Sequence, residues 1–153
     1  MVKRLCIIPC GSKKIWNIKP EAGPTEAKNV YMSNYHHYCQ KYAAQFFEHW
    51  VILSAKYGFL LPNDLVHSNY DVSFNRKSGE VITVDQLKQQ IIDKHLDDFE
   101  ALVVLGGKEY RKVVEQTFGN SYIYQYPLSD CSGIGYMIQK LKNAVLEDVE
   151  ISY

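Results

Sequence analysis

The sequence predicts a three-layer α/β fold, with helices on both faces of a mainly parallel sheet of about four strands. Short apolar runs recur along the chain, and each one ends in glycine or small polar residues. The segments between the runs show helical spacing of apolar residues. The 153 residues, 46% of them hydrophobic, suit one globular domain over residues 1–153. Alternating strands and helices favour parallel strands joined by right-handed crossovers.

The first strand and the first helix are expected in the amino-terminal third. Residues 4–10, "RLCIIPC", form a continuous apolar run that ends at Gly11, which is typical of a strand covered on both faces. Residues 11–24 contain glycine and proline and predict a loop. Tyrosines and other apolar residues then recur at near-helical spacing, so residues 25–47 are predicted to form the first long helix.

A second strand and a long loop follow. Residues 50–54 are apolar, and the strand ends as the first one does, with a hydroxyl, a lysine and a glycine at Ser54, Lys56 and Gly58. Residues 59–82 are irregular and contain Pro62, Asn63, Asn69, Asn75 and Gly79. A loop of this length in a compact domain is commonly functional, so we predict that it acts as a lid.

Capping signals locate the next helices. Thr83 and Gln86 match a capping box, which predicts a helix that continues to about His95. Residues 100–107, "EALVVLGG", predict a third buried strand that ends in two glycines. Gly107 is expected at the start of the helix that follows this strand.

One more strand and helix are expected in the carboxyl-terminal third. Residues 121–128 alternate and are rich in tyrosine, which predicts a fourth strand. Pro127 lacks a ladder donor, so this strand should lie at a sheet edge. Ser132 is expected to cap a helix that ends near Leu146, and residues 147–153 are expected to form a loosely attached tail.

Composition and charge exclude several classes of protein. No stretch of eighteen apolar residues could span a bilayer and no signal peptide is recognisable, so we expect a cytoplasmic protein without a membrane partner. The 17 basic and 17 acidic residues give a net charge of zero, so no global field attracts nucleic acid. Residues 1–30 hold six basic and two acidic residues, a local charge of +4 that indicates an anion site.

The four cysteines are expected to be free thiols. Cys6, Cys10, Cys39 and Cys131 show no paired C-x-x-C spacing and are too few for a disulfide scaffold. A metal site built from Cys10, Cys131 and a histidine is the alternative, but it would have to be assembled from distant loops. His36 and Cys39 form an i, i+3 pair without further ligands. No metal and no cofactor are therefore predicted.

The carboxyl edge of the predicted sheet gathers the candidate binding residues. Loops after parallel strands meet at one edge, where ligands bind. Lys13, Lys14 and Lys56 bring charge to this edge. Helix amino termini near Gly107 and Ser132 bring free N–H groups, so we expect a phosphate or carboxylate there. The plain alternative is that the glycines only end strands and the lysines are solvated. The sequence has neither a Walker A loop nor a dinucleotide-binding fingerprint.

Asp71 is the candidate acid or base. It follows Tyr70 in "NYDVSF", within the long loop. Near Ser54 and Lys56 it could orient water, accept a proton or stabilise a cationic sugar transition state. Ser54 and Lys56 are spaced i, i+2 and form a candidate nucleophile pair. The alternative for Asp71 is a turn residue that binds its own backbone.

Four ordered segments carry a family resemblance: "IIPCGSKK", "LSAKYGFL" followed by "YD", "VVLGGKEY" and "PLSDCSGIGYMI". Over residues 4–145 they resemble an uncharacterised bacterial and phage domain family. That family is distantly similar to YaaA-type peroxide-stress proteins and to the uracil-DNA-glycosylase-like domain of archaeosine synthase. The matching positions are Cys10, Gly11, Ser12, Lys13, Ser54, Lys56, Gly58, Tyr70, Asp71, Gly107 and Tyr110.

The resemblance implies a small doubly wound sheet, uracil-DNA-glycosylase-like or Rossmann-like, whose strand ends handle a nucleobase, nucleoside or nucleic acid. The Gly-Gln-Asp-Pro-Tyr motif and the His-Pro-Ser loop of uracil-DNA glycosylases are absent from the sequence, so that activity is not carried over.

Two hypotheses about function follow. The first is an enzyme, a hydrolase or transferase, that acts on a nucleoside, nucleotide or modified base at its N-glycosidic bond. In it Lys13 and Lys56 hold an anionic group and Asp71 serves the chemistry. The second is a non-catalytic module that binds nucleic acid or a partner protein. The net charge of zero favours a small anionic or nucleobase-containing ligand, because tracking of nucleic-acid phosphates normally needs a broad basic face.

Overall fold

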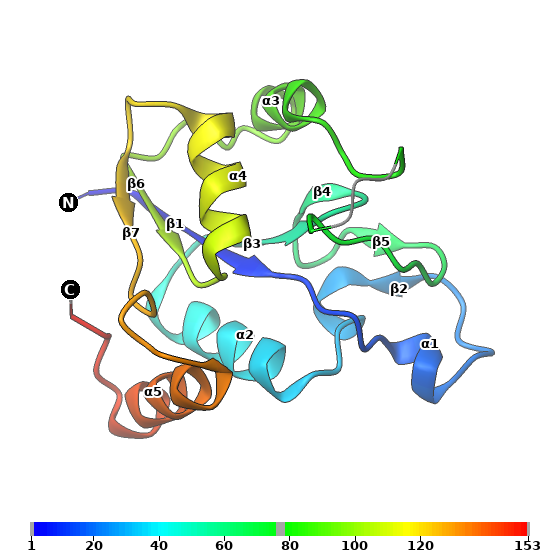
Figure 1. Cartoon of the computed structure of the whole chain (residues 1–153), viewed down its shortest axis with the longest axis horizontal. Helices are drawn as coiled ribbons and strands as arrows, with labels where there is room; N and C mark the ends of the chain where they lie inside the picture. Colours follow the sequence, from blue (N-terminus) through cyan, green and yellow to red (C-terminus); the bar gives the residue numbers. More distant parts are fainter. Residues whose placement is uncertain (1, 76–78, 153) are drawn as a thin grey trace.

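A computed structural model describes residues 2–75 and 79–152 and has an α/β fold built on a five-stranded sheet (Figure 1). The strand order is β4-β3-β1-β6-β7. Four strands are parallel and β4 runs antiparallel to β3, so the predicted sheet is confirmed with one additional edge strand. The strands are β1 (Arg4–Pro9), β3 (Trp50–Ser54), β4 (Gly58–Leu60), β6 (Ala101–Val104) and β7 (Ile123–Gln125).

Two pairs of helices cover the sheet, one pair on each face (Figure 1). The four are α2 (Asn34–Phe46), α3 (Val84–Asp93), α4 (Lys108–Phe118) and α5 (Ile134–Glu147). Helices α2 and α5 pack on one face around Cys39, Tyr42 and Leu141. Helices α3 and α4 pack on the other face around Leu87 and Val114. No helix in the described part of the chain is long and apolar enough to cross a membrane.

The connections create a switch point between β1 and β6. The chain passes from β1 to β3 through α2 on one face, and from β3 to β6 and from β6 to β7 through α3 and α4 on the other face. Right-handed crossovers require this, because β3 and β6 lie on opposite sides of β1. The chain therefore leaves the carboxyl ends of β1 and β6 toward opposite faces, and a crevice forms between these two ends.

The helix predicted over residues 25–47 is shorter than expected. Residues before Ser33 form β2 (Thr25–Glu26) and a 3₁₀ turn, and β2 pairs with β5 (Leu65–Val66). The α-helix begins only after Ser33, whose Oγ accepts the N–H of His36 at 3.1 Å. Pairing with a distant strand and a strong cap thus override the helical spacing of the sequence.

The capping box is confirmed at α3. Thr83 Oγ1 accepts the Gln86 N–H at 3.1 Å, and the Gln86 side chain accepts the Thr83 N–H at 2.9 Å. Gly107 is the N-cap of α4, as predicted. The prediction for α5 is off by one residue, because Gly133 rather than Ser132 occupies its N-cap.

The segment predicted as one long loop, residues 59–82, contains strand residues. Strand β4 doubles back on β3, and β5 pairs with β2. Residues 76–78 lie outside the described residues, so the proposed lid remains a prediction.

The carboxyl-terminal segment, expected to be loosely attached, is anchored at two points. Arg4 forms two hydrogen bonds to the Glu150 carboxylate, at 2.6 and 2.8 Å. Ile151 is 9% exposed, and its N–H donates to the Tyr42 hydroxyl at 3.1 Å. Residues 149–152 therefore join the face formed by α2 and α5. No local pattern in the sequence predicts these contacts, because their partners lie more than 100 residues away.

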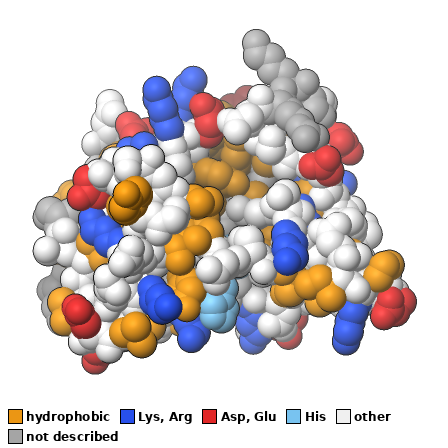
Figure 2. Space-filling view, turned by 60° about the horizontal axis from the view of Figure 1, so that its bottom comes forward, with side chains coloured by type: hydrophobic (Ala, Val, Ile, Leu, Met, Phe, Trp, Pro, Cys, Tyr) orange, Lys and Arg blue, Asp and Glu red, His pale blue; other side chains and the backbone are white. Residues whose placement is uncertain are grey.

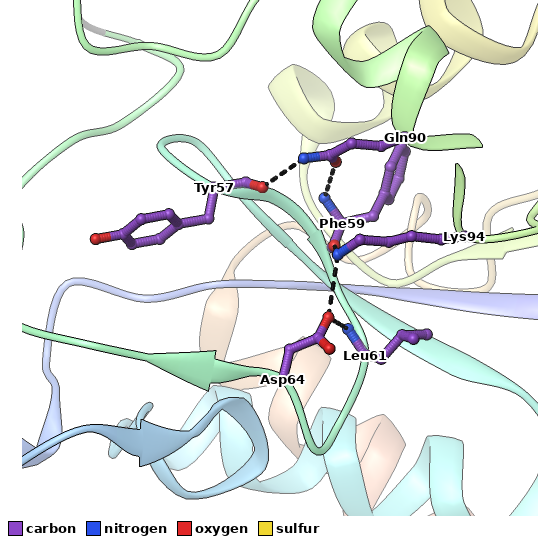
Figure 3. A network of polar contacts seen from close by, with 6 residues as sticks. All are labelled: Tyr57, Phe59, Leu61, Asp64, Gln90 and Lys94. Carbon is purple, nitrogen blue, oxygen red and sulfur yellow. Dashed lines mark hydrogen bonds and ion pairs between the residues drawn. The ribbon is translucent and has the colours of Figure 1, made fainter. Parts of the chain in front are cut away.

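Side chains of α3 and of its C-cap residue, Lys94, hold the turn between β3 and β4 (Figure 3). The Gln90 side chain accepts the Phe59 N–H and donates to the Tyr57 carbonyl oxygen, both at 2.8 Å. Lys94 forms an ion pair with Asp64 at 3.0 Å and also donates to the Phe59 carbonyl. The polar face of α3 thereby fixes the position of β4.

Gly58 in this turn meets a steric and a conformational requirement. Its φ of +76° is a left-handed conformation that favours glycine. A Cβ at this position would lie 2.2 Å from Gln90 Oε1 and 2.7 Å from Ile82 Cδ1. These contacts give Gly58, a predicted ligand-binding residue, a structural role in the turn.

We expect Gly58→Ala to lower the free energy of unfolding by about 2–4 kcal/mol, from the left-handed conformation and the overpacking together. Gly23→Ala is the matched control, because a Cβ there has no neighbour within 4 Å and the change should cost less than about 0.5 kcal/mol. Urea unfolding of both variants measures the difference. Equal stability of the two variants would contradict this role.

Candidate functional site

A cleft of about 520 Å³ lies at the carboxyl ends of β1 and β6, at the switch point. Its walls come from the loop after β1, from residues 71–75, and from the starts of α2, α4 and α5. Another hollow, of about 440 Å³, is lined by Arg4 and by Phe46–His49. It lies at the amino-terminal ends of β1 and β3, away from the loops in which ligands bind in such sheets.

The cleft brings together six of the eleven residues singled out from the sequence: Cys10, Gly11, Ser12, Asp71, Gly107 and Tyr110. The remaining five do not line it: Lys13, Ser54, Lys56, Gly58 and Tyr70. The topological rule therefore predicted where these six residues meet, and a role in ligand binding or catalysis remains a prediction for all eleven.

Lys14, rather than its neighbour Lys13, lines the cleft. Lys14 is 2% exposed, and Lys13 is exposed. A β-bridge between Lys14 and Tyr31, together with a 2.7 Å hydrogen bond from the Lys14 N–H to Asn17 Oδ1, fixes the backbone so that Lys14 faces inward. Lysine is rarely buried, so no sequence pattern distinguishes these two adjacent residues.

The Lys14 ammonium has few partners. Nζ donates to the Ser12 carbonyl oxygen at 3.2 Å and lies 4.3 Å from the centroid of the Tyr70 ring. Burial lowers the pKa of Lys14, and the nearby Cys10 and Asp71 side chains oppose this effect in part. No carboxylate of residues 2–75 or 79–152 forms an ion pair with it. The cleft therefore contains a buried cation that is only partly compensated.

Two helices begin at the rim of the cleft without side-chain caps. Gly107 and Gly133 are the N-caps of α4 and α5, and glycine has no side chain to accept the first N–H groups. Gly107 and Ile134 line the cleft. By contrast, Ser33 and Thr83 cap α2 and α3. The positive dipole ends of α4 and α5 therefore lie at the cleft that Lys14 also lines.

Cys10 and Tyr110 form a polar contact in the cleft wall. Cys10 Sγ lies 3.1 Å from the Tyr110 hydroxyl. Burial raises the pKa of Tyr110, so its hydroxyl stays protonated and can donate. Gly106 permits this packing, because a Cβ there would lie 2.6 Å from Tyr110 Cβ. The absence of a side chain at Gly106 therefore allows Tyr110 to pack against Cys10 at the end of β1.

Ser54 is buried in a chain of hydroxyl groups behind the cleft. Its Oγ accepts the N–H groups of Lys56 and Tyr57 at 3.2 and 3.1 Å. Because these bonds use both lone pairs, Ser54 donates its proton to the Tyr70 hydroxyl at 2.8 Å. The Tyr70 hydroxyl also bonds the Tyr31 hydroxyl. Ser54 thus closes the turn after β3 and anchors Tyr70, and a role for Ser54 and Lys56 in catalysis stays a prediction.

Asp71 comes directly after the anchored Tyr70 and is the carboxylate that lines the cleft among the described residues. Its side chain is exposed and close enough to Lys14 for their charges to interact. An acid or base at this position would face both the cleft and solvent. The predicted role of Asp71 in chemistry is compatible with this placement and remains a prediction.

His36 connects α2 to the end of β1 in a neutral form. Its Nδ1 lies 2.8 Å from the Pro9 carbonyl oxygen, which can only accept, so Nδ1 carries the proton. Nε2 then accepts from Gln40 Nε2 at 2.8 Å. Burial lowers the pKa of His36 to about 4. In the described ranges, no three His, Cys, Asp or Glu side chains are grouped as metal ligands, and all four cysteines are free.

The chain belongs to a family of unknown function, DUF6884, whose sequence model matches residues 5–143. This confirms the resemblance to an uncharacterised family. The chain is also 51% identical over 150 residues to the uncharacterized protein YfjM of Bacillus subtilis (strain 168). The alignment covers 98% of this chain and 100% of that protein.

His36 should make stability depend on pH. Its pKa of about 4 in the folded state lies below the unfolded value near 6.5, so the unfolded chain takes up the proton first as the pH falls. The contribution of neutral His36 to the free energy of unfolding is complete above about pH 6.5 and is lost toward pH 4. Between pH 6.5 and 5 the free energy of unfolding should fall by about 2 kcal/mol from this source.

Glutamine cannot titrate, so the free energy of unfolding of His36→Gln should fall less between pH 7.5 and pH 5.0 than that of the wild-type protein. Urea unfolding at the two pH values measures this difference. His37→Gln, an exposed neighbour on α2, should behave as the wild-type protein. Identical pH dependence of wild type and His36→Gln would show that His36 is not the group responsible.

Proposed function

We propose that the cleft binds a small anionic ligand that carries a nucleobase, a nucleotide or a negatively charged modified nucleoside. Lys14 would hold the anionic group together with the N–H groups at the starts of α4 and α5. The observation that carries this proposal is the buried Lys14 ammonium, which lines the cleft and, among the described residues, contacts the Ser12 carbonyl oxygen and the Tyr70 ring without an ion-pair partner.

The energetics of Lys14 favour an anionic ligand. Burial of a neutral polar group without a hydrogen-bond partner costs about 2–7 kcal/mol. Burial of a charge without a full set of partners also costs several kcal/mol. The Tyr70 ring returns only about 0.5–2 kcal/mol. A ligand anion would supply the missing partner, so the cost of burying Lys14 is reasonable in a binding site and hard to explain in a purely structural one.

The size and the walls of the cleft suit a nucleobase-containing molecule. Its volume of about 520 Å³ lies within the usual range for small-molecule sites. Tyr35, Val72 and Ile134 offer aromatic and apolar surface to a base. Ser73 and Asn75 offer polar groups that could select among ligands. This arrangement supports one base with an attached sugar or phosphate.

Action on the N-glycosidic bond would depend on Asp71. As the carboxylate in the described lining, it could activate water or stabilise a cationic sugar. Lys14 takes the binding role first expected of Lys13 and Lys56, which do not line the cleft. A reaction of the hydrolase or transferase class is therefore proposed around Asp71 and Lys14.

The second candidate is a nucleic-acid-binding module. One observation favours it. A hollow beside α4 is lined by three basic residues, Lys108, Arg111 and Lys112, and by Tyr126, whose ring centroid lies 5.5 Å from the Arg111 guanidinium. However, Glu109 and Glu115 border the same hollow. Figure 2 shows that, on the side bearing α2 and α5, lysine and arginine side chains are scattered among acidic and neutral ones rather than joined in a basic field. A small ligand is favoured over a long polyanion because acidic residues also interrupt the basic residues of α4.

A thermal-shift screen tests the proposal. The purified protein is compared in the presence of nucleobases, nucleosides, nucleoside 5′-monophosphates and short single-stranded DNA, at low and high salt. Stabilisation by a monophosphate that persists at high salt supports the small-ligand site. Stabilisation by DNA alone, lost at high salt, would favour the binding module instead.

Lys14→Met should raise the free energy of unfolding by about 1–2 kcal/mol, because an apolar side chain of similar size replaces a poorly compensated buried charge. The same variant should lose the stabilisation by nucleotide. Lys13→Met, the exposed neighbour, is the matched control and should keep both properties within about 0.5 kcal/mol. Undiminished nucleotide stabilisation of Lys14→Met would contradict the proposed role of Lys14.

A further inference from the structure

Tyr70 lies behind the cleft and contacts the elements that form it. It is 7% exposed, and its side chain is absent from the cleft lining. The next residue in the chain is Asp71, and residues 71–75 form one wall of the cleft. The position of Tyr70 therefore affects that wall directly.

The hydroxyl of Tyr70 connects three parts of the chain. It receives the proton of Ser54 at the end of β3 at 2.8 Å, and it also bonds the Tyr31 hydroxyl. Because Tyr70 accepts from Ser54, its own proton is directed to Tyr31. Tyr31 is in turn the β-bridge partner of Lys14. The hydroxyl chain thus ties the cleft wall to the backbone that carries Lys14.

The ring of Tyr70 acts on Lys14 itself. The ammonium lies 4.3 Å from the ring centroid, within the range of a cation–π contact. The Tyr57 ring packs edge-on against Tyr70 at 5.2 Å and limits rotation of the ring. The ring therefore offers a fixed surface on which the Lys14 ammonium is placed, close to the Ser12 carbonyl.

We infer that Tyr70 is a positioning residue, which holds the Lys14 ammonium and the segment that begins at Asp71 in place at the cleft. This inference rests on the proposed function, because the placement of Lys14 matters for binding only if the cleft receives an anion. The sequence predicted that Tyr70 contacts the ligand; in this inference Tyr70 instead affects binding through Lys14 and the segment that begins at Asp71.

Two substitutions separate the parts of the tyrosine. Tyr70→Phe removes the hydroxyl and keeps the ring under Lys14. Tyr70→Leu removes both. Tyr124→Phe is the control, since this half-buried tyrosine donates its hydroxyl to the Gly119 carbonyl in another part of the fold.

The readout is the acetylation rate of individual lysines by an N-hydroxysuccinimide ester of acetic acid, followed by mass spectrometry without any ligand present. Fragment ions that separate the two adjacent lysines distinguish Lys13 from Lys14. Access of the reagent limits the rate at Lys14, which is 2% exposed. Lys13 reports an exposed amine, and Lys94 reports an amine fixed by Asp64 elsewhere in the fold.

We expect Tyr70→Leu to raise the acetylation rate of Lys14 roughly 3- to 30-fold, the range that corresponds to loss of a cation–π contact. Tyr70→Phe should raise it less, and Tyr124→Phe should leave it unchanged. A rate at Lys14 within twofold of wild type in Tyr70→Leu would overturn the inference. An equal rise at Lys14 and Lys94 would also overturn it, because that pattern indicates general loosening.

A second arm uses orthophosphate as the anionic probe. Phosphate should slow acetylation of Lys14 in the wild-type protein, and this protection should be weaker by threefold or more in Tyr70→Leu. Equal protection of both proteins would overturn the inference. Absence of protection in wild type would contradict the proposed anion site, while the comparison of rates without phosphate would still decide whether Tyr70 positions Lys14.

Discussion

The pairing of β1 with β3 on one side and with β6 on the other determines where the cleft of this protein lies. Because both pairs are parallel, the three strands end at the same edge. Because the crossovers are right-handed, the chain leaves β1 and β6 toward opposite faces. A crevice at the carboxyl end of β1 follows from these two constraints. The loop after β1, the wall at residues 71–75 and the starts of α4 and α5 all meet in it.

The same arrangement explains how a lysine is buried in the cleft. The bridge to Tyr31 turns Lys14 inward, and the Tyr70 ring and the Ser12 carbonyl receive its ammonium. Two helices with glycine N-caps begin beside it and add positive potential rather than compensation. The Asp71 carboxylate lines the same cleft. The proposed binding of a small anion therefore rests on this local arrangement and not on the net charge of the chain, which is zero.

Local signals in the sequence were sufficient for several elements. The capping box at Thr83, the glycine that begins α4 and the apolar strands could be predicted because each depends on neighbouring residues. The helix predicted over residues 25–47 was too long because β2 pairs with β5, about 40 residues away. The anchored carboxyl-terminal segment depends on Arg4 and Tyr42, which no local pattern could connect to it.

The candidate site shows the same limit. Parallel topology was enough to predict that Cys10, Gly107 and Tyr110 would meet, because their positions follow from strand ends. Side-chain direction was not predictable. Lys13 and Lys14 are adjacent, and the β-bridge between Lys14 and Tyr31 decides which of the two side chains is buried. Ser54 points into the core because the N–H groups of Lys56 and Tyr57 donate to its oxygen.

A titration of ¹⁵N-labelled protein with adenosine 5′-monophosphate, followed by backbone amide chemical shifts, tests the central claim most directly. If the cleft at the switch point is the binding site, the largest changes will occur at Gly11, Ser12, Gly107 and Lys108. Adenosine without the phosphate should produce smaller changes at these amides. Changes confined to residues 111–115 and Tyr126, or no saturable change at any amide, would contradict the account.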